Sequence, residues 1–150
     1  MKISTILLFS LFWSSPSMMV SDSEDSAAIL QAVFTTQEVE REIIHTPRYE
    51  TSPSKLYMLD NEFTTGIEAI QLNSTELEVV SIEEIYSRRI LVYYVVHGLE
   101  QAGNTATVSF AQMRKVSGDE SVPGNYEARV SLRHNKGAWR ATRVKAQTEV

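Results

Sequence analysis

Strict alternation between apolar and polar side chains runs through the segment from Tyr126 to Arg133. The apolar residues stand at positions 126, 128, 130 and 132, with glutamate, arginine or serine between them. Because successive side chains of a strand point to opposite faces of a sheet, this pattern predicts a strand with one buried and one solvated face. Asn135-Lys136-Gly137 predicts a tight hairpin turn after it, and Ala138 to Lys145 predicts the returning strand.

Two more strands are predicted before this hairpin. Leu91 to Gln101 and Thr105 to Lys115 are rich in β-branched and aromatic residues, and Ala102-Gly103-Asn104 between them has the composition of a turn. Residues 91 to 96 are all apolar or aromatic, which is typical of a strand buried on both faces. The alternative is a strand at a sharply curled part of the sheet, with the helix on one side and a subunit or pocket lid on the other. The four strands together predict an antiparallel meander, one face of which has to be covered.

The cover is expected from residues 26–44, where the apolar positions follow helical spacing with a slip at Thr35-Thr36. We interpret this segment as one long amphipathic helix, bent or broken at the two threonines. Residues 56–59 and 75–80 predict short strands, and Ser81 with Glu84 predicts a capped short helix over residues 82–89. The predicted fold class is α+β: an N-terminal amphipathic helix packed on a curled, mainly antiparallel sheet that ends in a four-strand meander.

The first seventeen residues have the layout of a secretory signal peptide. Lys2 precedes an apolar run from Ile3 to Trp13, and small residues allow cleavage after Ser17. The alternative is an uncleaved membrane anchor, although the run is shorter than the roughly 20 residues of a spanning helix. The expected organisation is a signal peptide over 1–17, a polar lead-in over 18–25, a single α+β domain over 26–146 and a polar tail over 147–150, with no membrane span after cleavage.

The chain contains no cysteine. Small domains secreted into oxidising compartments usually depend on disulfides, so this domain has to be stabilised by burial alone. The roughly 130 residues after the signal peptide suffice for one core. We therefore expect an exported protein, periplasmic or secreted, and a bacterial source.

Charge is unevenly distributed along the chain. Residues 22–84 contain fourteen acidic and three basic residues, whereas residues 126–150 contain six basic and two acidic residues. One interpretation is a basic face for an anionic ligand, polymer or membrane surface. The other, which the acidic isoelectric point of about 5.2 favours, is that the acidic and basic halves cover each other in the fold or in a dimer. The same balance makes nucleic acid an unexpected partner.

The C-terminal half resembles the nuclear transport factor 2 / ketosteroid isomerase superfamily. The resemblance lies in Tyr93–Gln101, the turn at Gly103-Asn104, the strand Thr105–Phe110, and the hairpin from Tyr126 through Asn135-Lys136-Gly137-Ala138-Trp139. It covers roughly residues 91–144, whereas Pro47 and Pro53 interrupt a stretch where the superfamily carries more helix. It implies a cone-shaped pocket between helix and sheet, which some members use for acid–base catalysis and many only for binding, and it implies dimers in many members.

Acid–base catalysis in such a cone needs a base and an opposing hydrogen-bond donor. His97 is the candidate base and Tyr93 the candidate donor, since alternation places both on one strand face with Val95 and Leu99. Asp60 and Glu62 are the carboxylates expected at the mouth of the cone. The alternative is a partly exposed histidine near a strand end and two carboxylates that solvate a loop. No metal site is expected, because the histidines at positions 45, 97 and 134 are far apart and thiols are absent.

Four arginines on the last two predicted strands are the candidate ligand-binding residues: Arg129, Arg133, Arg140 and Arg143. They could form a cationic stripe whose guanidinium groups bind carboxylates or phosphates through paired hydrogen bonds. The alternative is a solvated sheet face on which they pair with Glu127 or another acidic neighbour.

Three functions remain open on this evidence. The leading hypothesis is a non-catalytic exported domain that binds a small apolar molecule or a protein, without a cofactor, as a homodimer through its sheet face. The second is a cofactor-free isomerase or dehydratase with His97 and Tyr93 in its cone. The third is a module that binds anionic envelope polymers through the arginine stripe. An inward His97 beside a carboxylate would favour the enzyme, and a cone filled by side chains would favour a structural or protein-binding role.

Overall fold

The computed structural model describes residues 23–45, 55–73, 75–117 and 120–148. The expected signal peptide and residues 18–22 of the polar lead-in lie outside these ranges. The elements are, in chain order, helices α1 (Ser23–Phe34) and α2 (Gln37–His45), strands β1 (Lys55–Leu59), β2 (Ala69–Gln71) and β3 (Glu76–Val80), helix α3 (Ile82–Ser87), and strands β4 (Val92–Ala102), β5 (Thr105–Ser117), β6 (Glu120–Asn135) and β7 (Ala138–Thr148).

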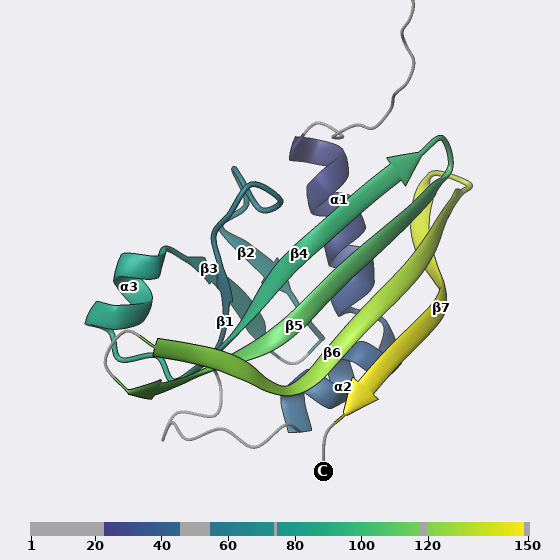
Figure 1. Ribbon diagram of the computed structural model, residues 1–150. Coiled ribbons are helices and arrows are strands. Elements are labelled where there is room, and N and C mark those ends of the chain that lie inside the picture. Colours follow the sequence, from purple (N-terminus) through teal and green to yellow (C-terminus); the bar gives the residue numbers. More distant parts are fainter. Residues whose placement is uncertain (1–22, 46–54, 74, 118–119, 149–150) are drawn as a thin grey trace, which may run out of the picture.

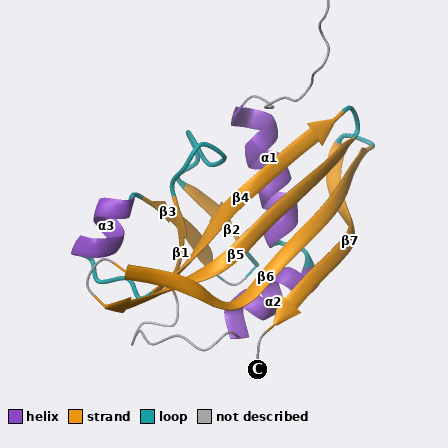
Figure 2. Cartoon of the chain, in the orientation of Figure 1, coloured by secondary structure: helices purple, strands orange, loops and turns teal. Residues whose placement is uncertain are grey.

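All strands belong to one seven-stranded sheet in the order β2-β3-β1-β4-β5-β6-β7. Strand β1 runs parallel to both β3 and β4, and every other neighbouring pair is antiparallel. The sheet curls into a half-barrel, with α1 and α2 packed against one face of β4–β7 and α3 beside β1 and β3 (Figures 1 and 2). The predicted α+β class is confirmed, and the described part of the chain has a cone-like arrangement of helices and curled sheet.

The N-terminal cover is two helices, separated at the two threonines. The Thr35 hydroxyl donates to the carbonyl of Gln31 at 2.7 Å, and the Thr36 hydroxyl donates to the carbonyl of Ala32 at 2.8 Å. Such bonds from β-branched residues to the preceding turn bend or end a helix. No helix in the described ranges is long and apolar enough to cross a membrane.

The main core lies between the two N-terminal helices and the sheet. Aromatic rings fill its centre: the Phe110 ring centroid lies 4.7 Å from that of Phe34, 6.4 Å from that of Tyr94 and 5.8 Å from that of Tyr126. Burial of such side chains stabilises the fold by about 1.5–3 kcal/mol each. These four rings occupy the region where the superfamily resemblance implies a pocket.

A second, smaller core lies on the opposite face of the sheet, under α3. Its buried members come from β1, β3, α3 and β4: Tyr57, Val80, Ile85, Ile90 and Tyr93. Strand β4 therefore supplies Tyr94 and Val96 to the main core and Tyr93 to the second core. This explains the unbroken apolar run over residues 91–96 and confirms the prediction of a strand buried on both faces. The short helix α3 has the predicted capping box, in which Ser81 and Glu84 exchange hydrogen bonds.

A β-bulge at His97 changes the face to which the end of β4 points. Val96 pairs with Phe110, but Gly98 pairs with Ser109, so His97 is the extra residue. Leu99 is consequently opposite Val108 and packs against the main core. The prediction that Leu99 shares a face with Tyr93 and His97 was therefore wrong, because simple alternation does not anticipate an inserted residue.

Candidate functional site

The four candidate arginines lie together on the face of the sheet opposite α1 and α2. On β6 the buried residues 126, 128, 130 and 132 point toward the helices, so Arg129 and Arg133 point away from them. On β7, Arg140 is paired with Arg133, Arg143 with Ser131, and Lys145 with Arg129. Paired residues share a face, and we define the cationic face as these five cations: Arg129, Arg133, Arg140, Arg143 and Lys145.

A second bulge brings Arg140 and Arg143 to the same face. Residues three apart in a regular strand point to opposite faces. Here Thr142 is inserted between the pairs Leu132–Ala141 and Ser131–Arg143, and its hydroxyl donates to the carbonyl of Ser131 at 3.2 Å. Lys145 follows Arg143 at strand spacing and was missed as a site residue, although that spacing is visible in the sequence.

All five side chains of the cationic face are exposed. The ion pairs recorded among the described residues join Lys55 and Arg88 to acids at the other end of the sheet, and none involves the cationic face. The expected pairing of Arg129 or Arg133 with Glu127 is therefore not observed. Glu100 and Glu127 lie on the same face and border its depressions, but neither forms an ion pair with these cations. Five cations against two acids leave this face with a net positive charge, which favours the approach of an anion.

Two neighbouring depressions lie between the cations. One, of about 320 Å³, is lined by Glu100, Thr107, Arg129, Ser131, Arg143 and Lys145. The other, of about 480 Å³, is lined by His97, Ser109, Glu127, Ala128, Arg129, Lys145, Ala146 and Gln147. Arg129 and Lys145 border both depressions, so a ligand in either one lies against the same two cations. Serine and threonine hydroxyls beside them add hydrogen-bond donors for an anionic group.

The structure separates the two residues of the candidate acid–base pair. His97 is exposed at its bulge and borders the larger depression. Tyr93 is only 3% exposed, belongs to the second core, and donates from its hydroxyl to Ser121 Oγ at 2.9 Å. Neither side chain points toward α1 and α2, the face of β4 on which Tyr94 and Val96 lie.

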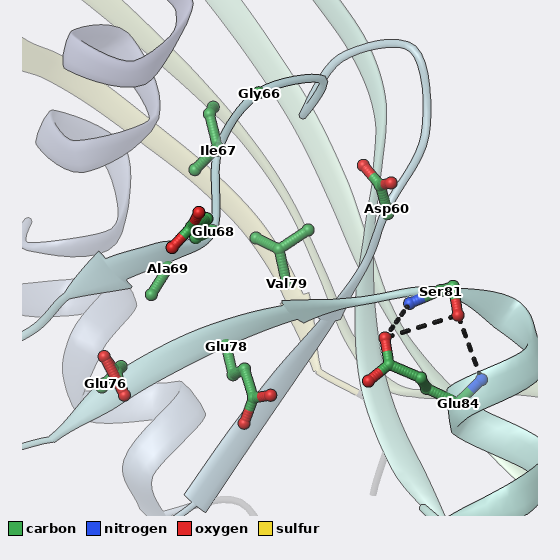
Figure 3. Close-up of a pocket in the computed structure, with 10 residues that line it drawn as sticks. All are labelled: Asp60, Gly66, Ile67, Glu68, Ala69, Glu76, Glu78, Val79, Ser81 and Glu84. Atoms are coloured by element: carbon green, nitrogen blue, oxygen red, sulfur yellow. Dashed lines mark hydrogen bonds between the residues drawn. The ribbon is translucent and has the colours of Figure 1, made fainter.

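Asp60 and Glu62 are exposed after β1, far along the sheet order from the cationic face. Asp60 accepts a hydrogen bond from the hydroxyl of Thr64 at 3.1 Å. It borders a depression of about 560 Å³ between β2, β3 and the start of α3, where carboxylates of Glu68, Glu76, Glu78 and Glu84 also gather (Figure 3). Asp60 and His97 thus lie in separate depressions.

The acids of this region are partly neutralised by cations from neighbouring elements. Glu78 lies 3.0 Å from Arg88 and 3.4 Å from Lys55. The hydrogen bond from Arg88 lowers the pKa of the Glu78 carboxyl below its ordinary value, and the same bond raises the pKa of Arg88. Within the described ranges, no group of three or more acidic or histidine side chains is arranged to hold a metal ion.

The phenol of Tyr126 is buried in the main core. Its hydroxyl has no hydrogen-bond partner within the described residues. Burial raises the pKa of Tyr126 to about 12, with smaller contributions from Glu42, Tyr94 and Glu38. The phenol is therefore neutral at ordinary pH and cannot serve as a base there.

No protein-family model, curated protein or solved structure matches this chain.

Proposed function

We propose that this chain is a non-catalytic binding domain that holds an anionic macromolecule on its cationic face. The observation that carries the proposal is the gathering of five exposed cations on two neighbouring strands, without an ion pair to any described acid. Each arginine can bind a carboxylate or phosphate through two parallel hydrogen bonds. A row of such groups also attracts an extended anion over a longer range than one pair does.

The interior offers less support for a binding site. Phe34, Tyr94, Phe110 and Tyr126 fill the centre of the main core, which favours the protein-binding alternative over a small apolar ligand. An isomerase or dehydratase would need His97 and Tyr93 to face a common enclosed site. His97 is exposed and Tyr93 is bonded to Ser121, so this arrangement gives the enzyme no support.

The separation of charge also supports a partner outside the chain. The acidic depression borders β2 and β3, at one end of the sheet order, and the cationic face lies on β6 and β7 at the other. The two therefore do not cover each other within the described fold. A homodimer that buried the cationic face against its own copy would bring like charges together, so we propose a foreign anionic partner for this face.

We further propose that the chain is a divergent member of the nuclear transport factor 2 / ketosteroid isomerase superfamily and that it is exported. The order of helices, short strands and final antiparallel strands supports the first statement. The layout of residues 1–17 supports the second. Expression of the full-length chain in a bacterial host tests export: we expect a periplasmic product whose mass begins near Met18. An uncleaved product in the membrane fraction would contradict it.

The binding function is tested by retention on immobilised polyphosphate in a salt gradient. We expect the protein to be retained at low salt, and the double variant Arg129→Ala, Arg143→Ala to elute at clearly lower salt because counterion release scales with the number of contacts. Arg41→Ala is the matched control, since Arg41 is an exposed arginine on α2 at the opposite face. Elution of all three proteins at the same salt concentration would overturn the proposal. If the protein forms a dimer at higher concentration and the dimer is no longer retained on polyphosphate, the cationic face is used for self-association.

A further inference from the structure

The two edge strands of the sheet differ in length and in what covers their outer side. At one edge, β2 is only three residues long, and a side chain from α1 covers it. The Gln31 amide donates to the carbonyl of Gln71 at 2.5 Å, and the Gln31 side-chain oxygen accepts from the N–H of Gln71 at 3.3 Å. Gln31 thus takes the place of a neighbouring strand at Gln71, and this protects the edge from further pairing.

At the other edge, β7 extends over eleven residues. It pairs with β6 on one side, and within the described ranges no strand pairs with its other side. In Figure 1 the C-terminal part of β7, toward its arrowhead, forms the outer margin of the sheet. Helix α1 packs against β7 on the core side. A long strand with one free row of N–H and C=O groups is a template on which another extended chain can form main-chain hydrogen bonds.

The side chains of β7 indicate which extended chain would fit. Arg140, Arg143 and Lys145 point to the cationic face, whereas Ala141 and Val144 pack against the main core. A strand laid beside β7 would place its own alternate residues on these same two faces. Cross-strand pairs of opposite charge stabilise a sheet, so acids are favoured on the first face and apolar residues on the second.

We propose that an extended acidic polypeptide segment, with glutamate or aspartate alternating with apolar residues, pairs with β7 as an eighth strand of the sheet. This inference rests on the proposed function, because it identifies the anionic macromolecule as a polypeptide. A second copy of the chain fits less well: antiparallel pairing of two β7 strands would place the cations of one copy beside those of the other. A polymer without amide groups could contact the cations but could not use the free edge.

The test compares two synthetic probes on the protein recovered from expression of the full-length chain. One is a nine-residue peptide of alternating glutamate and valine, and the other has the same side chains with every backbone amide N-methylated. We expect the first peptide to bind at least about tenfold more tightly, because only it can donate main-chain hydrogen bonds. We also expect alternate β7 amides, those on the free edge, to exchange their hydrogens more slowly in its presence.

A protein variant tests the charge requirement independently. Arg143→Glu is expected to lower the affinity for the unmodified peptide by about tenfold or more, since it replaces a charge attraction with a repulsion. Arg41→Glu makes the same change of charge on α2 and is expected to leave the affinity unaltered. Equal effects of the two substitutions would overturn the role of the β7 cations.

The outcomes separate this inference from the proposed function. Equal affinity for both peptides, without protection of β7 amides, would overturn strand addition while leaving binding of an anion intact. Failure of both peptides together with binding of polyphosphate would also overturn strand addition and would identify the partner as a polymer. Failure of the peptides and of polyphosphate would overturn both proposals. A dimer whose β7 amides are already protected in the free protein would assign the edge to a second copy.

Discussion

The side chain of Gln112 lies directly over the backbone of Gly124. Gln112 is only 1% exposed, and its Oε1 accepts a hydrogen bond from the N–H of Asn125 at 2.9 Å. Its Nε2 donates to the hydroxyl of Tyr94 at 3.4 Å. The single residue Gln112 therefore links β4, β5 and β6 where β6 bulges away from regular pairing. Glycine at position 124 leaves the space in which this amide lies.

Substitution of Gly124 by alanine should destabilise the fold. A Cβ at this position would lie only 2.8 Å from Cδ and 2.9 Å from Cγ of Gln112, so the buried amide would have to move away from its partners. We expect Gly124→Ala to lower the free energy of unfolding by about 1–3 kcal/mol in a urea titration. Gly98→Ala is the control, because a Cβ there would meet Ser109 at an ordinary 3.6 Å. Equal losses in both variants would refute the importance of the Gln112 contact.

Tyr126 should make the protein sensitive to alkali. Its folded-state pKa of about 12 lies above the ordinary 10.0, so stability is fully present below pH 10 and is lost as pH rises toward 12. The two-unit difference corresponds to about 3 kcal/mol in the free energy of unfolding. Tyr126→Phe should remove this part of the alkaline loss, and it should not reduce stability at pH 7, because the hydroxyl is buried without a described partner.

The measurement is urea unfolding at several values of pH between 7 and 12. Tyr86→Phe is the comparison, since Tyr86 lies on α3 and is only partly buried. Unchanged alkaline sensitivity in Tyr126→Phe would show that another group carries the effect.

The buried carboxylate of Glu40 depends on Asn73. Glu40 is 7% exposed and accepts hydrogen bonds from the Asn73 backbone N–H at 3.1 Å and from its side-chain amide at 2.8 Å. Asn73→Asp should replace one donor with a second carboxylate and lower the free energy of unfolding at pH 7 by about 1–3 kcal/mol. Asn104→Asp makes the same change in an exposed turn and should have little effect. Thermal unfolding of both variants measures the difference: we expect a lower melting temperature for Asn73→Asp than for Asn104→Asp. Similar melting temperatures would contradict the prediction.

The cationic face should bind polyphosphate in proportion to the number of its cations. Each single substitution by alanine at Arg129, Arg143 or Lys145 should reduce the slope of log affinity against log salt by about 1, because one fewer counterion is released. Titration of labelled polyphosphate at several salt concentrations measures this slope. If the slope is the same for all variants, the anion is bound elsewhere.

The sequence predicts which face an arginine points to only where the alternation within its own strand is regular. Arg129 and Arg133 follow from the alternation of β6, because the apolar residues between them have to be buried. Arg140 and Arg143 do not, since three-residue spacing places them on opposite faces unless a residue is inserted between them. The bulge at Thr142 depends on how β7 pairs with β6, and one strand's pattern carries no such information. The bulge at His97 misled the assignment of Leu99 for the same reason.

Short-range periodicity and local capping were enough to predict the antiparallel strands of the second half, the helix started by Ser81 and Glu84, and the class of the fold. The parallel pairing of β1, the register shifts, and the placement of acidic and basic residues at opposite ends of one sheet became visible in the folded chain alone. This is because periodicity acts within a few residues of chain, whereas register and strand order are set by packing between segments distant in sequence.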